Sequence, residues 1–209
     1  MSRRQAQTIQ IILIIILIVL FLLYRSRQPA KHPLHTQQEI SCGSPCGEER
    51  WAVKTLTDSD AGSVNYSPQP TTVGWLVSQA APAALPEDAR IAPIETQTYV
   101  VRAQLVGFKL EKDRDFHIVI ADLDTPTETM IVEIPSSSCS GVCASPRVED
   151  INAARASFVS MFGEPIERFQ RTSGTVQVTG VAFFDFLHHQ TGVASNGIEL
   201  HPVLNIQRE

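Results

Sequence analysis

The chain lacks an excess of positive charge. Its 209 residues contain 17 lysines and arginines against 22 aspartates and glutamates, a formal net charge of -5. Proteins that bind nucleic-acid backbones tightly and without sequence preference usually present a basic surface. The composition therefore argues against that function, whereas an apolar content of 43% is ordinary for a globular protein.

The chain also lacks the short motifs that mark common enzyme classes. It has no Walker loop, dinucleotide-binding glycine fingerprint, G-x-S-x-G elbow or H-E-x-x-H zinc motif. Its four cysteines do not have the C-x-x-C spacing of redox enzymes. No motif therefore supplies a reaction, and candidate residues have to be found through the expected fold.

One long apolar run lies near the start, from Ile9 to Tyr24. A membrane-spanning helix needs ~20 residues, with a lower limit near ~17, so the run with its flanks just suffices. No small-x-small cleavage site follows it. We expect a short cytoplasmic tail over 1–8 and an uncleaved signal-anchor helix over 9–24. A cleaved signal peptide is the alternative, and basic residues on both sides give no clear orientation.

The second half predicts a β-barrel. Apolar alternation indicates strands at 98–110, 116–121, 129–134, 175–186 and 197–206, with one helix between the third and the fourth. This order is that of a five-stranded OB-like barrel. We therefore expect a mainly β fold with one capping helix, preceded by the transmembrane helix. Gly107 and Pro202 are expected to mark bends or bulges.

The helix has clear start and stop signals. Ser145 suits the N-cap and Pro146 the first helical position, while Gly163 and Pro165 end the helix. Apolar residues recur at helical spacing and should plug one end of the barrel; they are Val148, Ile151, Ala154, Phe158 and Phe162.

The remaining residues are less patterned. We expect a polar tether over 25–45, a pre-barrel segment over 46–97 that packs on the barrel, and the barrel domain over 98–209. Within the pre-barrel segment, Trp51 to Leu56 is predicted as a short strand and 58–69 as turn-rich, while 71–78 fits a short helix or a buried strand.

The cysteines form two pairs, Cys42 with Cys46 and Cys139 with Cys143. An even number in an exported domain favours disulfides, and three connectivities are possible. Bridges between the two pairs would staple the N-terminal segment to the barrel. A four-thiolate zinc site is the alternative.

The strings ERWAVKTLTD, VTGVAFFDFLHHQTG and NGIELHPVL resemble those of a group of uncharacterised bacterial secreted or membrane-anchored proteins. The resemblance spans about Cys46 to the C-terminus. It implies a β-rich extracytoplasmic domain and carries no catalytic roles with it.

Histidines and acids cluster on the predicted strands and loops: His117, Glu133, Asp185, His188, His189, Glu199 and His201. The hairpin of the last two strands should bring Asp185 and His188 close to Glu199 and His201, and the last two share a strand face. Three interpretations remain open, and one of them is a pH-responsive contact, since histidine titrates near neutral pH. Buried histidines and acids often form a structural hydrogen-bond network. Alternatively, His188, Glu199 and His201 hold zinc or another divalent metal, and the candidate catalytic set of a hydrolase is His117, Asp185, His188, Glu199 and His201.

From the sequence we expect a single-pass protein of the cell membrane with an extracytoplasmic binding or interaction module. Its partner is expected to be an envelope protein or a glycan, with single-stranded nucleic acid less favoured because of the acidic balance. No cofactor is expected on this interpretation. A metal-dependent hydrolase with zinc or another divalent ion is the alternative.

Overall fold

A computed structural model describes residues 42–43, 46–47, 49–188 and 190–209. The expected tail (1–8), signal-anchor helix (9–24) and nearly all of the tether lie outside these residues. Among the residues described, no helix has the length and apolarity needed to cross a membrane.

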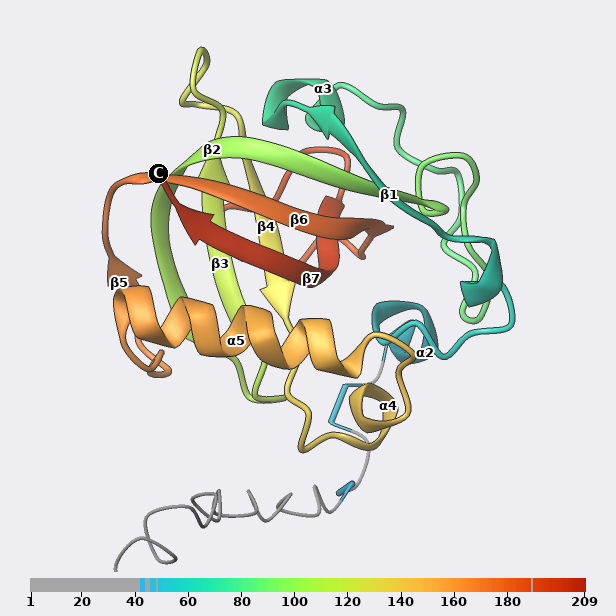
Figure 1. Ribbon diagram of the computed structural model, residues 1–209. Helices are drawn as coiled ribbons and strands as arrows, with labels where there is room; N and C mark the ends of the chain where they lie inside the picture. The colour runs from blue at the N-terminus through green and yellow to red at the C-terminus, as the bar shows by residue number, and fades with distance from the viewer. Residues whose placement is uncertain (1–41, 44–45, 48, 189) are drawn as a thin grey trace, which may run out of the picture. The chain divides into compact units, whose positions relative to one another are not determined.

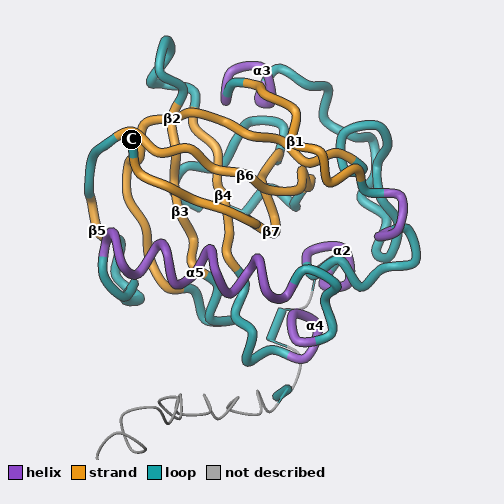
Figure 2. The backbone as a smooth tube through the Cα atoms, in the orientation of Figure 1, coloured by secondary structure: helices purple, strands orange, loops and turns teal. Residues whose placement is uncertain are grey.

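Short helices and strands precede the barrel, and a longer helix interrupts it (Figures 1 and 2). The helices are α2 (Trp51–Lys54), the 3-10 helix η1 (Ala61–Ser63), α3 (Val73–Val77), α4 (Ser140–Cys143) and α5 (Val148–Phe162). The strands are β1 (Asn65–Thr71), β2 (Gln97–Leu110), β3 (Phe116–Ala121), β4 (Thr129–Ile134), β5 (Gln170–Arg171), β6 (Thr175–Phe184) and β7 (Ile198–Arg208).

Five of these strands close into a barrel. The sheet runs β2-β3-β4-β7-β6, and β6 pairs back with β2. All neighbours are antiparallel except β4 and β7, which are parallel. The predicted mainly β fold and five-stranded barrel are confirmed, with β3 and β4 matching their predicted bounds and β6 ending two residues earlier.

Irregular register bends the barrel strands where the sequence predicted it. The β2–β3 register shifts between Leu105 and Gly107. A side chain at Gly107 would collide with the ring of Phe169 and the backbone of Gln170. The β6–β7 register shifts next to Pro202, which has no N–H to donate to the sheet. Both positions thus let long strands curve around the barrel.

Helix α5 packs across the end of the barrel (Figure 1). Its apolar stripe buries Ile151, Ala154 and Phe158, and the Phe158 ring meets Phe108 edge-on at 4.9 Å between centroids. The predicted start was wrong: Arg147 is the N-cap, and no side chain caps the helix. Ser145 instead accepts a hydrogen bond from the Arg147 N–H, so the chain makes one more turn before the helix begins.

The pre-barrel segment departs most from the prediction. Trp51 to Lys54 is helix α2 and not a strand, because Trp51 and Thr55 pack on α4 at Gly141. The segment described as turn-rich contains β1, which pairs in parallel with β2. Pro68 and Pro70 lie in this edge strand and lack the N–H groups that a further strand would need. Alternation could not reveal β1, because one of its faces is almost wholly exposed.

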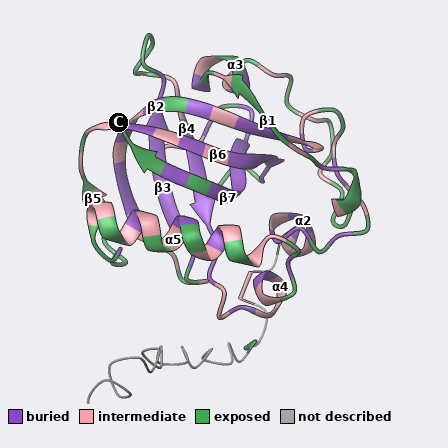
Figure 3. Ribbon diagram, viewed as in Figure 1, coloured by how far each residue is buried: buried purple, intermediate pink, exposed green. Residues whose placement is uncertain are grey.

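Two disulfides staple the N-terminal segment to the barrel domain. Cys42 is bonded to Cys143 and Cys46 to Cys139, so the disulfide prediction is confirmed and the connectivity, which the sequence left open, runs between the two pairs. A buried ion pair between Arg90 and Asp58, 2.6 Å long, adds a link within the pre-barrel segment. Figure 3 shows the barrel strands largely buried beneath these covering segments.

Candidate functional site

A cleft of about 510 Å³ lies between the start of the pre-barrel segment and two barrel loops. One loop joins β2 to β3 and contributes Glu111, Lys112 and Asp113, and the other follows β6. The remaining lining residues are Cys46, Gly47, Glu49, Lys54, Glu133, Asp185, His188 and Gln190. Five lining residues are acidic and two are lysines, so the cleft is acidic.

Strand register explains the polar cluster beside the cleft. In β3, β4 and β7 the core side chains alternate with residues that point to the outer face of the barrel. His117 pairs directly with Glu133 across β3 and β4. Ile131 pairs with Glu199 across β4 and β7, and two residues further this register places His201 beside Glu133. Three strands therefore bring these polar side chains together on one face.

Glu133 lies between the two histidines. Its Oε1 is 3.0 Å from His117 Nδ1, and its Oε2 is 3.2 Å from His201 Nδ1. The other nitrogen of His117 lies 3.0 Å from the carbonyl oxygen of Thr191, and that of His201 lies 3.5 Å from Asp115 Oδ2. His117 thus faces two acceptors, and it ties the loop after β6 to the sheet.

The environment sets the protonation of the charged groups beside the histidines. Burial alone would raise the pKa of Glu133, but the hydrogen bond to His117 and the attraction of His117 and His201 hold it well below its usual range. Burial alone would lower the pKa of Lys54, but Asp185, Glu133 and Glu199 raise it above its usual value. Glu133 and Lys54 therefore stay charged.

Two other carboxyl groups behave in the opposite way. Burial, reinforced by Asp113 and Glu133, raises the pKa of Asp115 well above its ordinary value. Burial, reinforced by Glu133 and Asp185, does the same for Glu199. Asp115 Oδ2, Glu199 Oε2 and both ring nitrogens of His201 are buried without a hydrogen bond of good geometry. Such groups are costly to bury, so they need a further partner or a proton.

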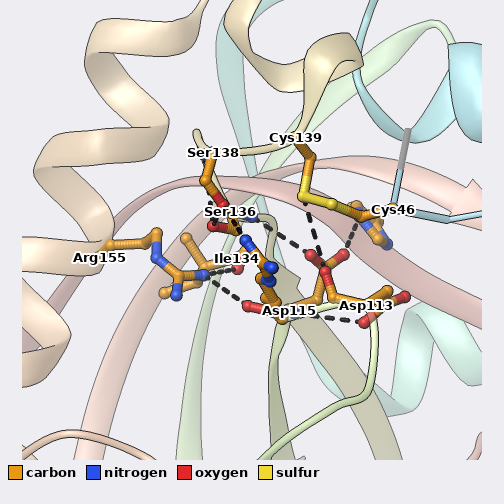
Figure 4. Close-up of a disulfide and its surroundings, with 10 residues drawn as sticks. Cys46, Asp113, Asp115, Ile134, Ser136, Ser138, Cys139 and Arg155 are labelled. Atoms are coloured by element: carbon orange, nitrogen blue, oxygen red, sulfur yellow. Dashed lines mark hydrogen bonds and ion pairs between the residues drawn. A yellow bond between two sulfur atoms is a disulfide. The ribbon is translucent and has the colours of Figure 1, made fainter. Parts of the chain in front are cut away.

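The Cys46–Cys139 disulfide holds the β2–β3 loop at the cleft (Figure 4). Cys139 Sγ lies 3.6 Å from the carbonyl oxygen of Asp113, and Asp115 Oδ1 accepts a hydrogen bond from the Ser136 N–H. From α5, Arg155 donates to the carbonyl oxygen of Ile134 at 2.6 Å. These contacts fix the loop and keep Asp115 buried beneath it.

The structure divides the predicted site residues into two groups. His117, Glu133, Glu199 and His201 lie on the buried outer face of the barrel. Asp185 forms a 2.9 Å ion pair with Lys54, and His188 lies 2.7 Å from Glu49 at the rim of the cleft. His189 lies outside the described residues.

Several residues of the site were missed at the sequence level. Lys54 and Asp115 contribute directly, and Glu49, Glu111 and Asp113 line the cleft. Lys54 reaches the site from a helix 131 residues earlier than Asp185, and no local pattern signals that contact. Asp115 was assigned to a turn, although its position directly before β3 places it next to His117.

Three groups of side chains within the described part of the chain have the spacing of metal ligands. They are Glu49 with Asp185 and His188, Glu111 with His117 and Glu133, and Asp115 with Glu133 and His201. The predicted metal set of His188, Glu199 and His201 does not recur as one group; His188 and His201 fall in different groups.

Comparison with known proteins adds no assignment, since no family model, curated protein or solved structure matches the chain. The disulfides give independent information about location. Disulfides persist in oxidising compartments and are rare in the cytosol. The two disulfides suggest an oxidising, extracytoplasmic environment for the domain.

Proposed function

We propose that this chain is a membrane-anchored extracytoplasmic binding module, built on an OB-type barrel, that binds a basic segment of a protein partner in its acidic cleft. The observation that carries the proposal is the cleft itself, with five acidic residues and two lysines around about 510 Å³. The anchor is the apolar run over 9–24, and the resemblance to secreted or membrane-anchored bacterial proteins agrees with this placement.

The position of the cleft supports a binding role. OB barrels bind ligands at the loop between the first two strands and the loop between the last two. Here these are the β2–β3 loop and the β6–β7 loop, and both line the cleft. The OB assignment itself is supported by the parallel β4–β7 pairing and by the place of α5 between the third and fourth barrel strands.

Charge selects the class of partner. Lys54 is already paired with Asp185, and Lys112 is the other lysine that lines the cleft. Phosphates of a nucleic acid would be repelled by the surplus carboxylates. Lysine or arginine side chains of a protein would be attracted.

Two exposed apolar residues are close in sequence to the residues of the acidic cleft. Phe186 is 39% exposed and Leu187 is 62% exposed, and in the chain both lie between the lining residues Asp185 and His188. Exposed apolar residues beside a charged cleft are typical of protein interaction sites. A segment that alternates basic and apolar residues matches both features.

The test uses the full chain in mild detergent and a fluorescent peptide of alternating lysine and leucine. We expect saturable binding, measured by fluorescence anisotropy, that weakens at least fivefold in Asp113→Asn and in Leu187→Ser. The matched controls Glu167→Gln and Ile166→Ser change an exposed acid and an exposed apolar residue that do not line the cleft. These two should bind as the parent does.

A glutamate–leucine peptide and a single-stranded oligothymidylate serve as competing probes. Tighter binding of either, or equal weakening by the control substitutions, would refute the proposal.

A further inference from the structure

The buried outer face of the barrel holds three side chains with metal-ligand atoms that lie close together. They are Asp115, Glu133 and His201, with exposed fractions of 0%, 6% and 0%. One ligand atom from each lies within 4.8 Å of the others. We propose that these three residues bind a divalent transition-metal ion of the zinc type, at a site that adjoins the acidic cleft through Glu133 and does not involve the peptide partner.

Distances within the group fit shared coordination better than hydrogen bonding. His201 Nε2 lies 3.5 Å from Asp115 Oδ2, and Nδ1 lies 3.2 Å from Glu133 Oε2. Neither contact of His201 has hydrogen-bond geometry. Two ligands of one zinc ion, each ~2.0–2.1 Å from it at a tetrahedral angle, are ~3.4 Å apart. Each separation is close to that of two ligands of one ion, and because an imidazole binds a given ion through a single nitrogen, only one of the two applies at a time.

Unpartnered buried atoms form the second, independent observation. Asp115 Oδ2 and both nitrogens of His201 are buried without a hydrogen bond. Buried polar atoms in a folded protein nearly always have a partner, so three on facing side chains call for one. A cation would satisfy Asp115 Oδ2 and one nitrogen of His201 together, and the other nitrogen of the ring would carry its proton. Imidazole and carboxylate are the donor types that zinc and its neighbours in the first transition row accept.

The local charge also favours a cation. Four carboxyl groups are buried here, those of Asp115, Glu133, Asp185 and Glu199. Lys54 pairs with Asp185, and Arg155 lies over the Phe116 ring with its guanidinium bound to backbone carbonyls.

The two other groups with metal-ligand spacing are weaker candidates for a metal site. His117 has an acceptor 3.0 Å from each ring nitrogen, and Lys109 Nζ lies 2.6 Å from Glu111 Oε1, so the Glu111 group is already satisfied. The group of Glu49, Asp185 and His188 is largely exposed and contains the Lys54 ion pair. His117 instead acts as a positioning residue that orients Glu133, as outer partners of metal ligands commonly do.

Glu133 lines the cleft as well as the group, so an ion can reach the site from the cleft. The test uses the full chain, purified in detergent under oxidising conditions and stripped with chelator. Zinc chloride is titrated by calorimetry, and cobalt binding is followed by visible absorption. We expect one ion per chain, with affinity at least tenfold weaker in His201→Gln and in Asp115→Asn. His188→Gln is the matched control and should bind as the parent does.

Asp115→Asn keeps the shape of the side chain, so it is informative even where His201→Gln fails to fold. Circular dichroism of the variant should match that of the parent. Zinc should also raise the melting temperature of the parent and not that of Asp115→Asn. Absence of a stoichiometric ion, unchanged affinity in Asp115→Asn, or loss of binding in His188→Gln would each overturn the proposal. None of these outcomes depends on whether the lysine–leucine peptide binds.

Discussion

The Arg50 guanidinium and the Glu95 carboxylate form a completely buried ion pair within the pre-barrel segment, and both groups bind the backbone of Phe184 at the end of barrel strand β6. Nη1 of Arg50 lies 2.6 Å from Oε1 of Glu95, and both side chains are 0% exposed. The same Nη1 donates to the carbonyl oxygen of Phe184, and Glu95 Oε1 accepts from the Phe184 N–H. The pair therefore holds the end of β6, directly before Asp185 of the cleft.

Removal of one partner of this pair should be strongly destabilising. Glu95→Gln leaves the Arg50 charge buried without a counter-ion, which typically costs about 3–5 kcal/mol. Urea denaturation of the variant should show this loss. Arg102→Ala, which breaks an exposed pair with Glu209, is the control and should cost about 1 kcal/mol or less. Equal effects of the two substitutions would contradict the structural role of Arg50 and Glu95.

Each disulfide should contribute strongly to stability because it closes a long loop. The bonded cysteines are separated by 101 and 93 residues. The double change Cys42→Ser with Cys143→Ser should lower the free energy of unfolding by about 2–5 kcal/mol. In the denatured but unreduced parent, iodoacetamide should label no cysteine. Labelling of two or four thiols would show that the bridges do not form.

The signal-anchor interpretation of residues 9–24 makes a prediction of its own. The full chain should stay in the membrane pellet after an alkaline carbonate wash. Ile15→Arg with Leu17→Arg should release it, since each buried arginine costs about 2.5–3.5 kcal/mol in a spanning helix. Leu13→Val is the control. A mature chain whose mass begins beyond residue 24 would establish a cleaved signal peptide instead.

Sequence patterns predicted the barrel well because its strands alternate. In β3, Phe116, Ile118 and Ile120 face the core, and the neighbouring residues face outward. The same alternation correctly placed Glu199 and His201 on one strand face. Alternation could not show that this face is buried, because the residues that cover it belong to α2 and to the loop that contains Thr191, which are distant in sequence.

Long-range pairing set the limits of the sequence prediction. The parallel β4–β7 register brings His201 to Glu133, whereas the sequence suggested only the β6–β7 hairpin as a route to the site. Helix α2 was misassigned for a similar reason. Its four residues carry no helical period, and its conformation depends on packing against Gly141 in α4.

Substitution of Phe158 tests whether the packing of α5 against the end of the barrel is required for stability. Its ring is 0% exposed and contacts Phe108, Phe116 and Phe162. Phe158→Ala should leave a cavity and cost about 3–5 kcal/mol, measured by urea denaturation. The control Ser160→Ala, on the exposed side of the same helix, should stay within about 0.5 kcal/mol of the parent. A small loss for Phe158→Ala would mean that the helix is not required to close the core.

Stability should fall as pH rises, because the raised pKa values of Asp115 and Glu199 make the folded state hold protons that the unfolded chain releases. The unfolded groups ionise near pH 4. Above that pH, each group that keeps its proton in the folded state lowers the free energy of unfolding by up to about 1.4 kcal/mol per pH unit. This decline ends once the pH passes the pKa of the group in the folded state. Glu133 has a lowered pKa and acts in the opposite sense, so its contribution is lost only in strong acid.

The slope should be measured by urea denaturation between pH 5 and 8 with chelator present, since a bound metal would replace the protons and reverse the trend. The side chains introduced by Asp115→Asn and Glu199→Gln cannot ionise, so each substitution should reduce the dependence of stability on pH. Relative to the parent, each variant should become more stable toward pH 8. Glu167→Gln, at an exposed site, should keep the parent slope. A parent whose stability rises across this range without metal would show that Asp115 and Glu199 are ionised in the folded protein.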